Sequence, residues 1–409
     1  MSVEAAAPLN AAVQLPDEEE ARCQSYGRVR FSLGIAELLV LLVVLVALTL
    51  SGAAAAILRF CTTPDAPLWV CHLVYLVVIG AITRLAVLPF HYFSEYWLDH
   101  RYGVTRQSLV SWAWEWLCRS AIFGLATVFV LFLVAESLRW PLLIVLWSLA
   151  YLPCRALFYD YIYSPVMGLF YPVRFLRNET FHLPGTGKVT LPVYQVQVSH
   201  KTGRANASIR LRGKRTAIYV TDTLIDEFTD GEERVVMAHE FGHLYDQVHL
   251  EARTPSGIAQ AQRKLMYGTA QLLAGAISLL VLMLLAPALH LSGASDLAGF
   301  PLLAAMTLAL GHCFAPILCA EARRDEKDAD QYALAITGDV ENYLSVMRKL
   351  RRMNLEESHS HPLARLLFDT HPTFSERCHV ALQYRRRLQR RRKSGNWRGW
   401  RHIQRHGRR

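Results

Sequence analysis

Charged side chains are scarce in this sequence. Asp, Glu, Lys and Arg account for 19% of the 409 residues, whereas soluble globular proteins carry about 25%. Hydrophobic residues account for 52% and gather in long runs. This composition excludes an ordinary soluble protein, because a run of about 20 apolar residues is long enough to cross a bilayer. The sequence therefore predicts a membrane protein.

Two further patterns are missing. None of the eight cysteines forms a Cys-x-x-Cys pair, so most are expected to be small buried hydrophobic residues. The first 30 residues contain an acidic run at 17–20 and lack the basic start of a signal peptide. The first apolar run is also too long for the core of a signal peptide, so we expect it to be retained.

Net charge is uneven along the chain. The total is +10, yet residues 385–409 alone hold twelve Lys or Arg and no acid, which leaves the rest near −2. Basic character therefore belongs to the C-terminal tail. We expect this tail to be disordered or to lie against anionic lipid headgroups, and we expect no nucleic-acid partner.

Six segments are long and apolar enough to cross a bilayer. They are the residues near 31–58, 68–91, 119–137, 140–160, 267–290 and 298–321. Arg84 and Arg155 lie in or near such segments, and each either extends towards an interface or faces the bundle interior. The sequence also allows a seventh span, in 92–118 or 161–176.

Lys and Arg are concentrated in the segments between certain spans. Most of them lie in 92–118, 161–266 and 322–409. The positive-inside rule then places both termini and the large polar segments in the cytoplasm. Within them, residues 188–198 and 214–221 alternate apolar and polar side chains, as half-buried strands do. A helix is predicted from about Asp230, because acidic residues favour the positive N-terminal end of a helix.

A His-Glu-x-x-His pattern lies on this helix. His239 and His243 are four residues apart and therefore share a face, so both imidazoles can reach one zinc ion. Glu240 lies beside them and can take the proton of an attacking water molecule. The pattern predicts a zinc hydrolase, and its place between two strands and two membrane spans favours a peptidase.

The third ligand has two candidates. His249 has the spacing of a metzincin's third histidine, but Asp246 stands where that family needs glycine, and an unbroken helix places His249 about 80° from the metal face. Glu326 and Asp330 are one turn apart on a later helix. Glu326 can ligate zinc while Asp330 steadies a ligand histidine, although spacing alone equally allows a solvated helix face.

The ordered motifs resemble those of the type I CaaX prenyl protease family, which are integral-membrane zinc peptidases. The resemblance covers roughly residues 31–384. It rests on Asp99-His100-Arg101-Tyr102-Gly103 with Gln107 and Ser108, Asn206-Ala207 ahead of 215–224, His239-Glu240-Phe241-Gly242-His243, Glu326 with Ala329-Asp330, His371-Pro372, and Glu376-Arg377.

The resemblance implies a set of site residues. One Zn²⁺ per chain would be held by His239, His243 and Glu326, with Glu240 as the base. His371 would stabilise the oxyanion, and Asp330 with Arg377 would support the ligands. Asn206 and Ala207 would bind the substrate backbone. Without the family, His371 reads equally as a turn histidine before proline and Asn206 as a loop residue.

The resemblance also implies a fold that is mainly α. We expect a polytopic helical bundle of six or seven spans around a chamber, with a small α+β zinc-peptidase domain. The predicted segments are an N-terminal tail (1–30), a four-span region (31–165), a segment with the strands and zinc helix (166–266), two spans (267–322), the third-ligand helix with the His-Pro motif (323–384) and a basic tail (385–409).

These features predict a membrane zinc endopeptidase similar to the CaaX prenyl proteases. Its expected partners are the lipid bilayer and peptide or protein substrates that are prenylated or membrane-associated. The alternatives are a quality-control protease of the heat-shock type and a non-enzymatic membrane scaffold. The composition favours a bacterial inner membrane, or the ER membrane if the protein is eukaryotic, with the active site on the cytoplasmic side.

Overall fold

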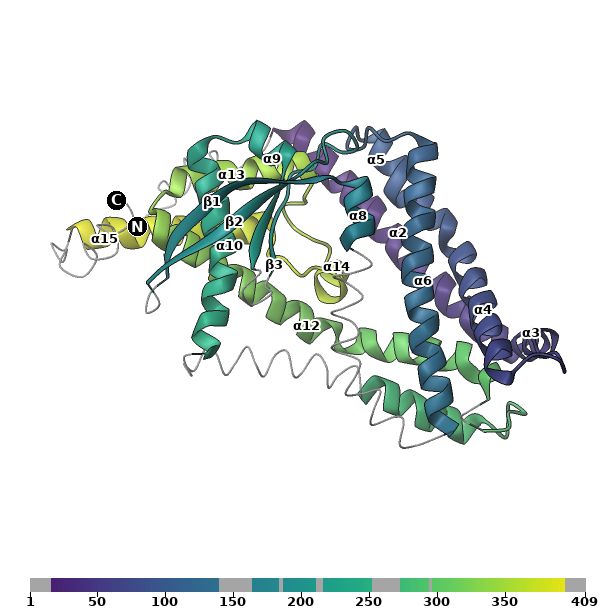
Figure 1. Cartoon of the computed structure of the whole chain (residues 1–409). Coiled ribbons are helices and arrows are strands. Elements are labelled where there is room, and N and C mark those ends of the chain that lie inside the picture. Colours follow the sequence, from purple (N-terminus) through teal and green to yellow (C-terminus); the bar gives the residue numbers. More distant parts are fainter. Residues whose placement is uncertain are drawn as a thin grey trace.

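The computed structural model describes residues 16–139, 164–183, 187–210, 216–251, 273–293 and 296–393. The described chain is mainly helical and contains one four-stranded sheet (Figure 1). Its main helices before the sheet are α2 (Asp17–Leu50), α3 (Ala53–Cys61), α4 (Leu68–His91), the π-helix η2 (Tyr92–Trp97), α5 (Leu98–Arg101), α6 (Leu109–Arg139) and α8 (Ser164–Phe170). Those after it are α9 (Asp222–Glu227), α10 (Asp230–Glu251), the short η5 (Leu297–Gly299), α12 (Phe300–Thr337), α13 (Val340–Asn354), α14 (Pro362–Leu367) and α15 (Phe374–Lys393).

Long apolar helices account for much of the described structure. Within the described residues, four helical stretches are long and apolar enough to span a membrane, and a shorter apolar helix covers Leu273–Leu285. The four stretches are Asp17–Leu50, Leu68–Arg101, Leu109–Glu136 and Leu297–Thr337. The prediction of a helical membrane bundle with a small sheet is therefore confirmed. The predicted span near 140–160 and the start of the one near 267–290 lie outside the described residues.

Two predicted boundaries near the N-terminus were wrong. Helix α2 already begins at Asp17, so residues 17–30 are not a tail. The span expected at 31–58 is two helices, because α2 ends at Leu50 and Gly52 adopts a left-handed φ of 75° before α3. Glycine reaches this conformation without steric cost, which lets the chain turn there.

Other boundaries differ further along the chain. No separate span lies in 92–118, where α4 continues through η2 and α5 and α6 then begins at Leu109. The described part of 161–176 holds only α8 and the start of a strand. Helix α12 is a single helix of 38 residues that crosses the predicted boundary at 322, and α15 continues to Lys393, into the predicted tail.

The sheet has the strand order β1-β2-β4-β3. Strands β1 and β2 are antiparallel, β2 and β4 are parallel, and β3 pairs antiparallel with β4. β3 is therefore an edge strand. The predicted strands at 188–198 and 214–221 correspond to β2 and β4. The bounds are β1 Val173–Leu183, β2 Gly187–Val196, β3 Ala207–Arg210 and β4 Ala217–Thr221.

One face of the sheet packs on α10. Val193 and Ile218 from the sheet are fully buried against Met237 and Phe241 of the helix. Helix α10 begins at a capping box, in which Glu232 accepts hydrogen bonds from the Thr229 backbone and hydroxyl. Figure 1 shows α10 beside the sheet and α12 running from below α10 towards the far ends of α4 and α6. This packing fixes the orientation of the zinc helix predicted above.

Polar contacts join the sheet to the membrane helices. Lys201, in the loop between β2 and β3, forms a buried ion pair with Glu115 of α6 at 2.8 Å. Tyr171, which follows α8, donates a hydrogen bond to the same carboxylate. Thr105 and Thr202 form an isolated antiparallel bridge beside this pair. The first turns of α6 therefore lie level with the sheet rather than deep in the membrane region.

Candidate metal centre

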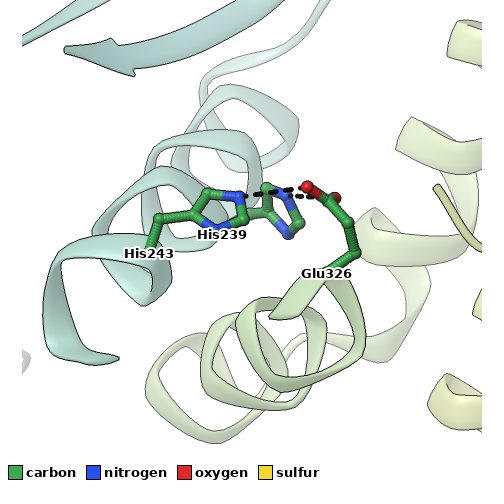
Figure 2. Close-up of side chains that lie close together, drawn as sticks. All are labelled: His239, His243 and Glu326. Carbon is green, nitrogen blue, oxygen red and sulfur yellow. Dashed lines mark ion pairs between the residues drawn. The ribbon is translucent and has the colours of Figure 1, made fainter. Parts of the chain in front are cut away.

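Three side chains converge between α10 and α12. His239 and His243 lie one turn apart on α10 and point towards Glu326 on α12 (Figure 2). The Nε2 atoms of His239 and His243 lie 3.3 and 3.5 Å from the two carboxylate oxygens of Glu326. Each residue offers one atom to a common point, since these three atoms lie within 4.8 Å of one another.

The spacing of these atoms fits a zinc ion. Tetrahedral zinc with ligands at about 2.0–2.1 Å keeps its ligand atoms about 3.3 Å apart. The two nitrogen–oxygen distances around Glu326 have this size. Two imidazoles and one carboxylate also match the ligand types of catalytic zinc sites, which leave a further position open.

A close contact between glycine and alanine lets the two helices approach. Gly242 lies between the histidines, and a Cβ added there would meet Ala329 Cα at 2.8 Å and Ala329 Cβ at 3.1 Å. Ala329 lies between Glu326 and Asp330, one turn after the carboxylate of the cluster. The small residues therefore bring the three side chains of the cluster on α10 and α12 within reach of one another.

Replacement of Gly242 by Ala is expected to separate α10 from α12. The new methyl group meets main chain, which cannot rotate away, so the protein loses about 1–3 kcal/mol of stability and its zinc affinity falls. Zinc content after dialysis against a chelator series, with the thermal midpoint, measures both effects. Gly124→Ala is the control, because its Cβ meets nothing within 4 Å. Unchanged zinc affinity in Gly242→Ala would contradict the role of this contact.

Asp330 supports His239 from behind. The Nδ1 atom of His239 lies 3.0 Å from Asp330 Oδ1, so Nε2 is the nitrogen left for a metal. Arg377, from α15, holds the same carboxylate through two hydrogen bonds of 2.9 and 2.6 Å. Asp330 is fully buried. A buried carboxylate that is paired on both sides fixes the imidazole in one orientation.

The two histidines differ in their affinity for a proton. Burial alone would lower the pKa of His239, but hydrogen bonds to Asp330 and Glu326 outweigh it and raise that pKa to about 10. Burial, together with the charge on His239, lowers the pKa of His243 to about 4. Of the two imidazoles, His239 therefore holds a proton much more readily than His243.

Glu240 lies buried between the cluster and the sheet. It is 6% exposed, and a backbone hydrogen bond from Ile209 connects it to strand β3. Burial raises the pKa of Glu240, although the charge on His239 and the Ile209 hydrogen bond act in the opposite direction. The carboxylate is thus a stronger base than an exposed glutamate, and it stands next to an edge strand.

Of the remaining predicted residues, His371 lies beside the cluster. His371 Nε2 is 3.5 Å from Glu326 Oε1, and the side chain is 66% exposed. Asn206 precedes β3; its carbonyl accepts a hydrogen bond from the Thr221 backbone N–H, and its own N–H donates to the Thr221 hydroxyl. Ala207 is the first residue of β3. His249 lies within α10, but its side chain is outside the described part of the structure.

Two residues that contribute to this geometry were missed in the sequence. Gly242 was visible inside the motif, where a residue without a side chain suggests close helix packing. Arg323, one turn before Glu326, donates hydrogen bonds to the backbone carbonyls of Arg365 and Asp369. It anchors the loop that carries His371 to α12. No sequence pattern indicates this contact, because its acceptors are main-chain atoms.

Comparison with known proteins identifies the family. The family model described as peptidase family M48 matches residues 181–385, half of the chain. The chain belongs to peptidase family M48. A second model, described as the CAAX prenyl protease N-terminal region with five membrane helices, matches residues 2–168. The resemblance found in the sequence is thereby confirmed, and with it the expectation of a membrane metalloprotease.

Individual relatives agree with this assignment. The chain is 25% identical over 311 residues to an uncharacterized metalloprotease, YhfN, of Bacillus subtilis (strain 168), covering 74% of this chain and 71% of YhfN. The crystal structure of Ste24p from S. mikatae matches with a TM-score of 0.64 at 17% identity, over 90% of this chain and 89% of that one. The chain therefore has a Ste24p-like fold and is an integral membrane protein.

Proposed function

We propose that this metalloprotease is a zinc endopeptidase whose single zinc ion is held by His239, His243 and Glu326. The observation that supports the proposal is the convergence of these three side chains at the spacing of tetrahedral zinc ligands. When bound, zinc supplies Lewis acidity to a water molecule and to the substrate carbonyl. Asp330 and Arg377 keep His239 oriented for this task.

Glu240 serves as the general base in this proposal. Its carboxylate takes a proton from the attacking water and passes it to the leaving amine. His371 donates a hydrogen bond to the carbonyl oxygen as negative charge develops there. Its exposed ring, near Glu326 and at the end of a loop anchored by Arg323, suits a group that meets substrate.

The edge strand β3 offers a place for an extended substrate. One side of β3 pairs with β4, and the other is not paired within the described sheet. A peptide added along Asn206 and Ala207 would gain main-chain hydrogen bonds and pass Glu240, which contacts β3 at Ile209. We infer that substrates bind as an additional strand and that the active site faces the cytoplasm. The protein itself would lie in the inner membrane of a bacterium, or in the ER membrane of a eukaryote.

The match to the CAAX prenyl protease N-terminal region favours prenylated C-terminal segments as substrates. The test compares a farnesylated peptide ending in a CaaX sequence, the same peptide without the lipid, and an unstructured loop of a membrane protein. Purified zinc-loaded enzyme is expected to release the last three residues of the farnesylated peptide about tenfold faster than those of the lipid-free one. Equal rates would instead support general membrane-protein turnover, and cleavage of none would contradict the peptidase proposal.

A further inference from the structure

A cluster of ionisable side chains lies between the membrane helices, away from the metal centre. Glu95, in the π-helix η2, accepts a hydrogen bond of 2.6 Å from Arg119 of α6 and lies 3.2 Å from His91 at the end of α4. His91 also lies 3.4 Å from Glu37 of α2. Ionisable groups at such positions are costly, and π-helical turns often occur at functional sites.

The cluster borders a cavity of about 110 Å³ between α4, η2 and α6. A volume of this size holds a phosphate or carboxylate group, since one water molecule takes about 30 Å³ of liquid. Its wall combines cationic, aromatic and hydroxyl groups. It includes Arg84, His91, Glu95, Trp116, Arg119 and Phe123.

The cavity offers hydrogen-bond donors without acceptors. The Trp116 Nε1 and Arg119 Nε atoms are buried and have no hydrogen-bond partner. Arg84 forms no ion pair in the described part of the chain. Both oxygens of Glu95 are already engaged, one by His91 and one by Arg119. The unpartnered polar groups in the wall are N–H donors, and Arg84 adds a positive charge that faces the cavity, which together favour an anion.

The cavity lies close to the polar contacts that join the membrane helices to the sheet. Arg119 lies one helical turn, about 6 Å, beyond Glu115, which pairs with Lys201 of the sheet loop. Aromatic side chains gather at this level, as they do at membrane–water interfaces, and several are exposed. They are Tyr92, Phe93, Tyr96, Trp97, Trp112, Trp114 and Trp116.

We propose that this cavity binds the phosphate group of an anionic phospholipid. Phe123, in its wall, is 40% exposed, and Leu125 and Leu117 of the same helix are 61% and 52% exposed, which offers apolar surface to the acyl chains. Basic pockets between membrane helices on the cytoplasmic side are known to hold such headgroups. A zwitterionic headgroup fits less well, because it would bring its cation close to the positive charges of Arg84 and Arg119.

The experiment uses the full-length protein in detergent and native mass spectrometry. Wild type is titrated with phosphatidylglycerol, with phosphatidylcholine of the same acyl chains, and with inorganic phosphate. We expect one phosphatidylglycerol per chain, with affinity about tenfold above that for phosphatidylcholine and no competition from equimolar phosphate. Equal binding of both lipids, or displacement by phosphate, would overturn the proposal.

Variants locate the bound lipid. Arg84→Gln is expected to weaken phosphatidylglycerol binding about tenfold, and the matched control Arg59→Gln, an exposed arginine of α3, is expected to leave it unchanged. Trp116→Phe keeps an aromatic side chain of smaller size and removes the N–H donor, so it tests the site without a loss of charge. Retention of lipid by both Arg84→Gln and Trp116→Phe would overturn the assignment, as would an equal loss in Arg59→Gln. Zinc content of each variant reports that it is folded.

Discussion

Replacing Glu240 by Gln is expected to lower peptide hydrolysis by about 10²- to 10⁴-fold while zinc stays bound. The amide keeps the size and hydrogen-bonding reach of the carboxylate but cannot accept the proton of the attacking water. Since Glu240 is not one of the three converging ligands, its loss leaves the metal cluster intact. The ratio kcat/KM on a quenched peptide, with zinc per chain by atomic emission, separates the two effects.

A matched control is available on the preceding helix. Glu227 is an exposed glutamate of α9, and Glu227→Gln changes the charge by the same amount away from the cluster. It should hydrolyse peptides at the wild-type rate. Retained turnover in Glu240→Gln would contradict the assignment of the base. The same variant also serves in cells, where substrates that accumulate uncut can be identified by comparing proteomes.

Replacing Glu326 by Ala is expected to remove zinc from the protein. One of three ligands is lost, and the two histidines are left with Asp330 as the nearby acid, which is already held by Arg377. The affinity should fall by more than the roughly 10- to 100-fold that loss of an outer hydrogen-bond partner costs. Competition with a fluorescent chelator measures the dissociation constant, and circular dichroism shows whether the variant remains folded.

The control for this experiment is His249→Ala. His249 lies on the same helix as the ligand histidines, about 80° from their face. Its replacement should leave zinc affinity unchanged. Loss of zinc in His249→Ala together with its retention in Glu326→Ala would instead indicate a ligand set of three histidines.

The local part of the site could be predicted because helix geometry is local. Residues four apart share a face, so His239 and His243 were placed together from their spacing alone. The role of Glu326 could not be predicted in this way, since the sequence around it equally allowed a solvated helix face. The distances of 3.3 and 3.5 Å to the histidines depend on the approach of α10 to α12 at Gly242, which only tertiary packing determines.

Strand β1 was not predicted from the sequence, and its pairing gives a physical reason. In β1 the register shifts between Phe175 and Arg177, so one extra residue interrupts the pairing with β2. A bulge of this kind moves the following side chains to the other face and breaks the alternation by which strands are recognised. Strands β2 and β4, in which the alternation continues, were found from the sequence.

The charged groups of the membrane region could not be paired from the sequence. Arg84 was expected either to reach an interface or to face the interior, and no pattern related it to Glu95 or Arg119. These residues come from different helices, and only packing places them around one cavity. The change of composition near 322 also led to a wrong segment boundary. Ala, Arg, Glu and Lys are good helix formers, so they continue α12 past its apolar part.

Helix α12 is continuous, so it sets the distance between the elements at its two ends. One end of the stretch Leu297–Thr337 is tied to the membrane bundle, where Tyr75 of α4 donates a hydrogen bond to the Leu297 carbonyl at 2.9 Å. Near the other end stands Glu326, and at about 1.5 Å per residue the rise of an unbroken helix sets the distance between them. Helix α12 therefore holds the candidate metal centre at a set distance from the membrane helices that pack on its other end.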